Sequence, residues 1–204
     1  MRKGLKQFGF FAVLAAVIIV IFFHSVSFVS AAWVAKIIDF TSGAGQYSSI
    51  AVDSNGKVHI SEYSSVGLRY CNNTASNGAW SCANVSGSGS GTAGQYSSIA
   101  VDSNGKVHIS EAYTTINQDL RYCNNTASSG AWSCATIDDS SGYLGSYTSI
   151  AIDSNNKVHI SEYNATGNGL RYCNNTASNG AWSCALIDTR STQSLRAYSA
   201  IALN

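Results

Sequence analysis

The stretch YSSIAVDSNGKVHISEY, residues 47–63, recurs in nearly identical form in a chain of 204 residues. Close copies begin at Tyr96 and Tyr147, and a fourth begins at Tyr198. Each full copy holds two runs rich in β-branched and aromatic residues on either side of Asp-Ser-Asn-Gly or Asp-Ser-Asn-Asn. Such runs, separated by Asp, Asn and Gly, are typical of antiparallel strands joined by tight turns. The stretch therefore predicts a β-hairpin at each occurrence.

A second phrase, RYCNNTASNGAWSC at 69–82, follows the hairpin and recurs almost unchanged at 121–134 and 171–184. Together the two phrases predict four short strands in each repeat of about 50 residues, which is the pattern of a β-propeller blade. No segment beyond residue 32 has a helical period, and this argues against helical repeats. We therefore expect an all-β, propeller-like array of four-stranded antiparallel blades, with an open β-solenoid of stacked sheets as the alternative.

The two ends of the repeat array each predict one lone strand. Residues 33–39 align with 132–138, the last strand of a blade, and residues 198–204 align with the first strand. Three complete blades fall short of the usual minimum of about four. We therefore expect an incomplete ring, or a ring that a partner chain completes. The predicted blades cover about 47–85, 96–138 and 147–188.

Residues 1–32 differ from the remainder of the chain. Basic residues precede an apolar run from Phe8 to Phe23, and small residues follow up to Ala32. This order is typical of a secretory signal peptide, whose apolar run is shorter than the roughly 20 residues of a spanning helix. We predict an N-terminal hydrophobic helix that is cleaved as a signal or kept as a membrane anchor. The β-propeller repeat domain at 33–204 is then secreted or held at the extracytoplasmic cell surface.

The charge of the exported part argues against some partners. Three of the twelve Lys and Arg residues lie in 1–32, which leaves nine against eleven Asp and Glu residues. Nucleic-acid binding usually needs a concentrated basic face. We therefore expect no nucleic-acid partner, and contact with a membrane only through the N-terminal segment.

The hairpin phrase IAVDSNGKVHIS at 50–61 resembles the first hairpin of the NHL and SBBP families of propeller repeats. The longer pattern through HISEY, LRYCNN and AWSC resembles the BNR, or sialidase-like, repeats of exported bacterial and archaeal proteins. The resemblance covers nearly all of 33–204 and implies a propeller architecture. The Asp box of sialidases, Ser-x-Asp-x-Gly-x-Thr-Trp, differs from DSNGKVH at 53–59, which has one more residue before the glycine and no tryptophan.

Each repeat contains two cysteines with ten residues between them. Across a hairpin these positions face each other within disulfide reach, and an exported chain favours local bridges. A rival is a metal site: if Glu62 pairs with Leu68, His59 falls opposite Cys71 and a Cys-Cys-His cluster forms. Zinc sites usually show closely spaced ligand pairs and a fourth ligand, so we predict no metal. The predicted disulfides are Cys71–Cys82, Cys123–Cys134 and Cys173–Cys184.

Two further repeated sets of side chains, an arginine with a tyrosine and a histidine with a glutamate, are of types found in catalytic sites. Arg69, Arg121 and Arg171, with the tyrosines that follow them, resemble in type the catalytic set of sialidases. Equivalent positions of a propeller spread around the ring, however, and a catalytic residue usually occurs once. The histidine of each repeat precedes a glutamate by three residues, and on a strand such positions point to opposite faces. We therefore expect structural ion pairs or surface positions for the arginines, and histidines that are packed or hydrogen-bonded between blades.

The repeats differ mainly in two loops, which lie on one face of an up-and-down blade. One loop joins the second strand to the third, and the other leads to the next blade, as in DDSSGYLG at 138–145. Loops on a rigid scaffold are where binding specificity usually resides, although drift of unconstrained loops is the alternative. The binding candidates on this variable-loop face are Tyr113, Asn117, Asp119, Asp139, Tyr143 and Asn164.

No unique carboxylate pair and no unique nucleophile with a base stands out in the sequence. We therefore predict an exported, non-catalytic propeller module without a cofactor, which binds glycans or extracellular proteins through the variable-loop face. One alternative is a fragment of a larger sialidase-like propeller glycosidase or lyase. Another is a structural fragment with no activity of its own.

Overall fold

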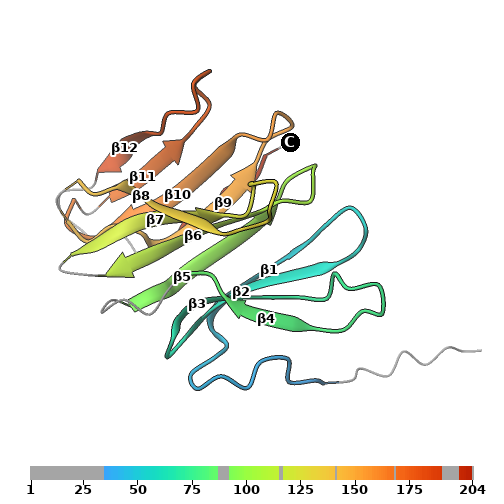
Figure 1. Ribbon diagram of the computed structural model, residues 1–204. Coiled ribbons are helices and arrows are strands. Elements are labelled where there is room, and N and C mark those ends of the chain that lie inside the picture. The colour runs from blue at the N-terminus through green and yellow to red at the C-terminus, as the bar shows by residue number, and fades with distance from the viewer. Residues whose placement is uncertain are drawn as a thin grey trace, which may run out of the picture. The chain divides into compact units, whose positions relative to one another are not determined.

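The computed structural model contains three antiparallel sheets of four strands, each with its strands in chain order (Figure 1). It describes residues 35–86, 92–114, 117–140, 142–167, 169–189 and 198–203. The first sheet consists of β1 (Gln46–Val52), β2 (Val58–Ser64), β3 (Gly67–Asn72) and β4 (Ser81–Asn84). The second sheet consists of β5 (Thr92–Val101), β6 (Val107–Thr114), β7 (Gln118–Asn124) and β8 (Ser133–Asp138). The third sheet consists of β9 (Ser146–Ile152), β10 (Val158–Asn164), β11 (Gly169–Asn174) and β12 (Ser183–Thr189).

These sheets have the all-β, four-stranded antiparallel form that the repeats predict. Among the residues listed above there is no helix, and hence none that is long and apolar enough to cross a membrane. The predicted N-terminal hydrophobic helix at 1–32 lies outside the described residues.

The turn between the first two strands of a sheet depends on one aspartate. Asp53 Oδ1 accepts hydrogen bonds from the backbone N–H groups of Asn55 and Lys57, both at 2.8 Å. Gly56 lies between them with a φ of +72°, a left-handed conformation that glycine adopts without steric cost. The other two sheets repeat both bonds, with Asn156 at φ +58° in place of the glycine in the third. The turn phrase thus closes each hairpin through side chain to backbone bonds.

The pairing of β2 with β3 differs by one position from the register that a metal site would need. Glu62 lies opposite Arg69, so His59 lies opposite Asn72 and not opposite Cys71. Because neighbouring positions on a strand point to opposite faces, the side chains of His59 and Cys71 lie on opposite faces of the sheet. The Cys-Cys-His cluster considered from the sequence is therefore wrong.

Each sheet packs face to face on the next, and we call its two sides the leading face, toward the preceding sheet, and the trailing face, toward the following one. Leu68 and Tyr70 on the trailing face of the first sheet are buried with Ile99 and Ile109 on the leading face of the second. Full burial of such a side chain contributes roughly 1.5–3 kcal/mol. The junction of the second and third sheets buries the equivalent side chains Leu120, Tyr122, Ile150 and Ile160.

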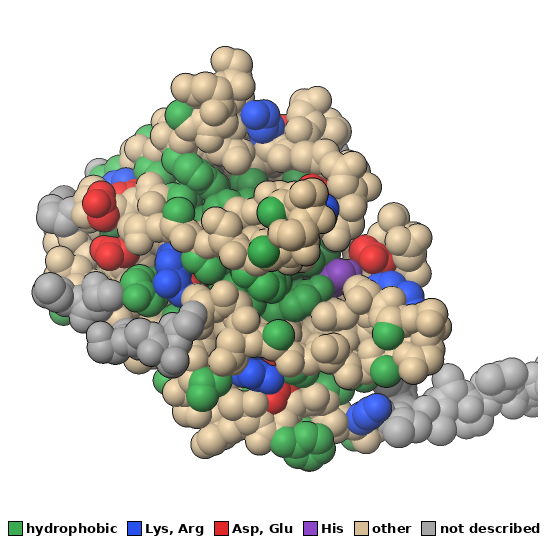
Figure 2. Space-filling model, viewed as in Figure 1, with side chains coloured by type: hydrophobic (Ala, Val, Ile, Leu, Met, Phe, Trp, Pro, Cys, Tyr) green, Lys and Arg blue, Asp and Glu red, His purple; other side chains and the backbone are tan. Residues whose placement is uncertain are grey.

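The surface in Figure 2 reflects this packing. Hydrophobic side chains gather in the middle of the visible face, while Lys, Arg, Asp and Glu side chains are scattered around them in small numbers. Positive charge is not concentrated on the face shown in this view.

The first strands of neighbouring sheets are also joined by hydrogen bonds from and to side-chain hydroxyl groups. Ser97 Oγ donates to the carbonyl oxygen of Tyr47 at 3.0 Å, and the N–H of Ile99 donates to Ser49 Oγ at 3.3 Å. The same two bonds join β5 to β9, and β9 to residues 198–203. Residues 198–203 therefore take the place of the first strand of a fourth sheet.

Residues 36–39 take the place of the last strand of a sheet that would precede the first. Asp39 forms an ion pair with Arg69 of β3, and Asp138 at the end of β8 pairs in the same way with Arg171 of β11. The sequence predicts strands at both ends of the array. In the described residues neither terminal segment forms a strand, because each lacks the neighbouring strands of its own sheet.

Candidate functional site

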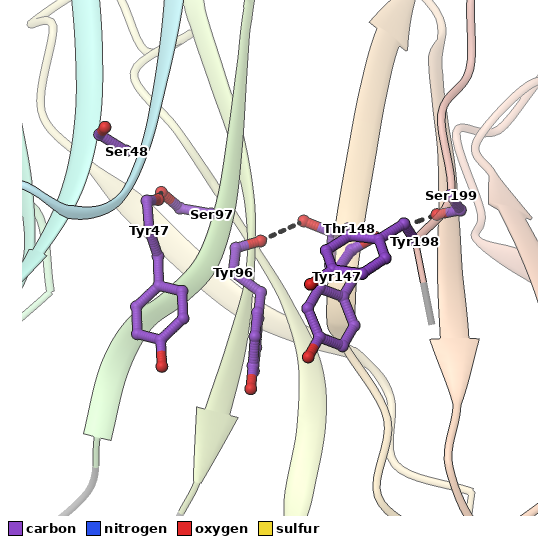
Figure 3. Close-up of a pocket in the computed structure, with 8 residues that line it drawn as sticks. All are labelled: Tyr47, Ser48, Tyr96, Ser97, Tyr147, Thr148, Tyr198 and Ser199. Atoms are coloured by element: carbon purple, nitrogen blue, oxygen red, sulfur yellow. Dashed lines mark hydrogen bonds between the residues drawn. The ribbon is translucent and has the colours of Figure 1, made fainter. Parts of the chain in front are cut away.

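The interlocked first strands bring four tyrosines into one row, and we call Tyr47, Tyr96, Tyr147 and Tyr198 the tyrosine row (Figure 3). Successive ring centroids lie 4.7, 4.4 and 4.5 Å apart, and successive rings are tilted by 57°, 49° and 53°. Figure 3 shows the phenol groups of Tyr47, Tyr96 and Tyr147 projecting in the same direction. Aromatic pairs at such distances stabilise one another beyond the effect of their burial, so each ring supports its neighbours in the row.

The row depends on an unusual backbone conformation. Tyr47, Tyr96 and Tyr147 have φ angles of 50°, 52° and 51°, in the left-handed region. For a residue other than glycine this costs roughly 1–2 kcal/mol. In each sheet the pairing of the first two strands shifts register at this tyrosine, and such a bulge redirects the side chain. Strain repeated at three equivalent positions is a reason to look for a function there.

Glycines two positions before the tyrosines let the chain pass close to its neighbours. A Cβ on Gly94 would lie 2.9 Å from Leu68 Cα, and a Cβ on Gly145 would lie 2.9 Å from the carbonyl oxygen of Asp119. The N–H of Gly94 donates to the buried carboxylate of Glu111. In the second and third sheets the Gly-x-Tyr phrase therefore lets the chain pass close to the preceding sheet just before its tyrosine.

A cavity of about 410 Å³ lies along the row. Its lining contains hydroxyl groups but no Lys, Arg, His, Asp or Glu side chain. Hydroxyl groups both donate and accept hydrogen bonds, so the cavity suits a neutral ligand that is rich in hydroxyls. The lining residues are Tyr47, Ser48, Tyr96, Ser97, Tyr147, Thr148, Tyr198 and Ser199.

The phenol of Tyr96, in the middle of the row, keeps its proton at neutral pH. Burial raises the pKa of Tyr96 to about 12, and its neighbour Tyr147 adds to the shift. The two ends of the row are open, since Tyr47 is 42% and Tyr198 80% exposed, whereas Tyr96 and Tyr147 are half-buried. A ligand can therefore meet ring surface at the ends and phenol groups along the middle.

The six binding candidates chosen from the variable loops have different surroundings, and none of them lines this cavity. Tyr113 is half-buried, with the guanidinium carbon of Arg121 3.8 Å from its ring centroid. Asn164 is buried, and its Oδ1 accepts a hydrogen bond from the N–H of Gly167 at 2.7 Å. These two side chains hold the local structure together. The remaining four are exposed or half-exposed: Asn117, Asp119, Asp139 and Tyr143.

The variable loops nevertheless lie at the same end of the sheets as the tyrosine row, because the loop that enters each sheet leads directly into its tyrosine. Residues 142–145 precede Tyr147 by this route. Asp119 and Asp139 come close enough that Asp139 contributes to a raised pKa of Asp119, although burial is the larger cause. The variable loops and this cavity thus lie at the same end of the sheets, and none of the six predicted binding residues is part of the lining.

The arginines of the third strands are held in ion pairs and do not line the cavity. In the second sheet Arg121 pairs with Glu111 of its own sheet, with N–O distances of 2.7 Å. Ser86 stands where the other repeats have an aspartate, and its buried Oγ has no hydrogen-bond partner among the described residues. The pairs are Arg69 with Asp39, Arg121 with Glu111, and Arg171 with Asp138.

Buried glutamates at these junctions predict a stability that falls as the pH rises. Burial raises the pKa of Glu62 and of Glu162 to about 7, and that of Glu111 to about 6. An unfolded glutamate titrates near pH 4.3, so between about pH 4.5 and 7 the folded chain holds protons that the unfolded chain has lost. We expect the urea midpoint to decrease from pH 5 to pH 7.5, and Glu162→Gln to make the decrease smaller. A midpoint that increases over this range would contradict the assignment.

The histidines are hydrogen-bonded, as expected, but within one sheet and not between sheets. His59 Nδ1 lies 2.6 Å from Tyr70 Oη, and its Nε2 lies 3.5 Å from Asp53 Oδ2. The second and third sheets repeat both contacts. Every cysteine is in a disulfide, so no sulfur is free to bind a metal. The bonded pairs are Cys71–Cys82, Cys123–Cys134 and Cys173–Cys184.

No family model and no curated protein matches this chain. Among solved structures it is similar to a fucose lectin from Kordia zhangzhouensis in complex with methyl-fucoside, at 17% identity and TM-score 0.46, over 70% of this chain and 99% of the lectin. It is also similar to an endo-arabinanase from Bacillus licheniformis, at 16% identity and TM-score 0.45, over 69% and 55% of the two chains. An arabinanase from Bacillus subtilis matches at 12% identity and TM-score 0.47, over 74% and 59%. The matched regions cover less than two thirds of either arabinanase, and at these identities and TM-scores the likeness assigns neither a family nor an activity.

Proposed function

We propose that this chain is an exported, non-catalytic module that binds neutral glycans at the end of its sheets where the tyrosine row lies. The observation that carries the proposal is a cavity lined only by Tyr, Ser and Thr. Sugars present hydroxyl groups and apolar C–H faces, which match phenol groups and aromatic rings in kind. The cavity has no fixed charge in its lining, so a charged ligand would find no ionic partner there.

In this proposal the three sheets are consecutive blades of an incomplete propeller, at about 47–85, 96–138 and 147–188 of a domain that covers 33–204. Residues 1–32 serve to export it. The three disulfides support this location, because such bonds persist in oxidising compartments.

The variable loops adjust specificity at the rim of the cavity. Tyr143 is 58% exposed, and Asn117 and Asp139 are also exposed, so they are available to a glycan or to an extracellular protein that carries one. Most glycoside hydrolases, the alternative, use two carboxyl groups that flank the scissile bond. The cavity lining offers none, which favours binding over hydrolysis.

Removing one hydroxyl group or one ring from the tyrosine row is expected to weaken glycan binding without changing the fold. For Tyr96→Phe we expect a dissociation constant about 2- to 10-fold higher, since one hydrogen bond contributes about 0.5–1.5 kcal/mol. For Tyr198→Ala, which removes an exposed ring, we expect a larger loss. Titration calorimetry of the full chain against a panel of neutral oligosaccharides measures both effects.

Two further variants make this test specific. Trp80→Phe lies at the turn before β4, at the opposite end of the sheet from the row, and should leave affinity unchanged. Tyr143→Phe reports the contribution of the loops. If no neutral glycan binds, or if only the loop variant matters, the tyrosine row is not the binding site. Release of reducing sugar during incubation would identify a hydrolase instead.

A further inference from the structure

The leading face of the first sheet is exposed to solvent over β1 and partly exposed over β2. Ile50 is 64% and Val52 60% exposed, whereas Ile99 and Ile150, the equivalents of Ile50 in the other sheets, are 5% and 7% exposed. The difference arises because, in the part of the chain that the structure describes, no sheet packs on this face of the first one. A cleft of about 510 Å³ lies on this face, lined by Ser48, Ser49, Ile50 and Ile60.

The outer half of the same face is already occupied by the chain itself. Asp39 pairs with Arg69, and the carbonyl oxygen of Ile38 lies 3.5 Å from Cys82 Sγ. What remains open is the place that β1 takes against the second sheet and β5 takes against the third. The vacant slot therefore fits the first strand of a repeat.

Residues 198–203, which take the place of a first strand, have an uncovered side. On one side it is attached to β9, where the N–H of Ile201 donates to Ser149 Oγ at 3.1 Å. Ala200 and Ala202 are exposed. Ala202 occupies the position of Ala51, which in the first sheet packs against the cluster that contains Ile99.

We propose that residues 198–203 of a second copy of this chain dock on the leading face of the first sheet, head to tail. The contact continues an interface that the chain already makes between its own sheets, with Ile50 against Ala202 as Ile99 lies against Ala51. Tyr198 of the second copy then stacks on Tyr47, and Ser48 Oγ donates to its carbonyl oxygen as Ser97 Oγ does to that of Tyr47. The tyrosine row thereby continues from one copy into the next.

The two surfaces in this contact are different, so it is a heterologous interface that either closes into a ring or extends. One bond of the internal interface is missing, because Ala200 stands where Ser49 accepts a hydrogen bond from the next strand. The contact between copies is accordingly weaker than the contact between sheets. It depends on concentration, which makes it measurable.

Native mass spectrometry and sedimentation of the full chain in a mild detergent test this proposal. We expect dimers or larger species that increase with concentration, and an association about tenfold or more weaker for Ile50→Lys. Ile187→Lys is the matched control, because Ile187 is a similarly exposed isoleucine, at 58%, on the outermost strand β12. It should associate like the parent chain. Circular dichroism and intact disulfides establish that both variants fold.

A mixing experiment identifies the two surfaces. Ile50→Lys and Ala202→Glu each remove one side of the contact, and a mixture of the two should form dimers that neither forms alone, because each variant keeps the surface that the other has lost. A chain that stays single at all concentrations overturns the proposal. So does an association that Ile50→Lys leaves unchanged, because it would place the interface elsewhere.

Discussion

Replacing Arg121 with methionine is expected to lower the free energy of unfolding by about 3–5 kcal/mol at pH 7.5, because it leaves a buried carboxylate without its cation. Glu111 is fully buried, and the Arg121 guanidinium lies 2.7 Å from its Oε1. The third sheet has Asp138 as a further acceptor for its arginine, but Ser86 provides none for Arg121. The ion pair at this junction therefore has no second carboxylate from the preceding repeat.

The pH dependence separates this cause from simple loss of packing against Tyr113. Burial raises the pKa of Glu111 to about 6, so at pH 5 the carboxyl group is mostly protonated and needs no cation. We expect urea unfolding to show a clearly smaller loss for Arg121→Met at pH 5 than at pH 7.5. The double variant Glu111→Gln with Arg121→Met should recover part of the loss at pH 7.5, since the amide oxygen still accepts the N–H of Gly94. An equal loss at both pH values would assign the effect to packing instead.

The sheets were predictable from the sequence because their determinants are local. Asp53 and Gly56 specify the first turn within a few residues, and the spacing of Cys71 and Cys82 places them opposite each other on adjacent strands. The register of β2 on β3 was not predictable in the same way. The register changes by one position with the length of the turn after Ser64, and the residues there do not specify a single turn length.

The tyrosine row was not identified from the sequence, because the sequence of a repeat does not show whether equivalent residues of successive sheets meet or spread apart. Equivalent residues on outer strands spread apart, which is correct for Arg69 and its counterparts. Equivalent residues on the first strands converge, so Tyr47 and Tyr96 meet although each belongs to its own repeat. The signal was present in the Gly-x-Tyr phrase, but the left-handed tyrosine accompanies a shift of register between the first two strands of each sheet, which the phrase does not show. The variable loops lie at the same end of the sheets as the row, whereas Tyr113 and Asn164 contact their own local structure and do not line the cavity.

Reduction of the three disulfides is expected to unfold the chain under conditions in which the oxidised form is stable. Each bond joins cysteines that are 11 residues apart in sequence, so it contributes about 3 kcal/mol on the chain-entropy model. The three bonds are in separate sheets and should act nearly independently, for a total of about 9 kcal/mol. That sum is comparable to the whole stability of a typical domain, about 5–15 kcal/mol.

The effect of losing each disulfide depends on the strand that it holds. Cys82 anchors β4, a strand of four residues that is otherwise mostly exposed, and Cys134 anchors β8, which is preceded by Trp132. The ring of Trp132 packs on Tyr70 of the preceding sheet, with centroids 5.2 Å apart, so release of β8 also uncovers the first junction. We expect Cys173→Ala with Cys184→Ala to lower the free energy of unfolding measured in urea by about 3 kcal/mol, one third of the total, because this pair holds only the last sheet. Mass spectrometry that shows six free thiols together with an unchanged midpoint would mean that the outer strands are held by packing alone.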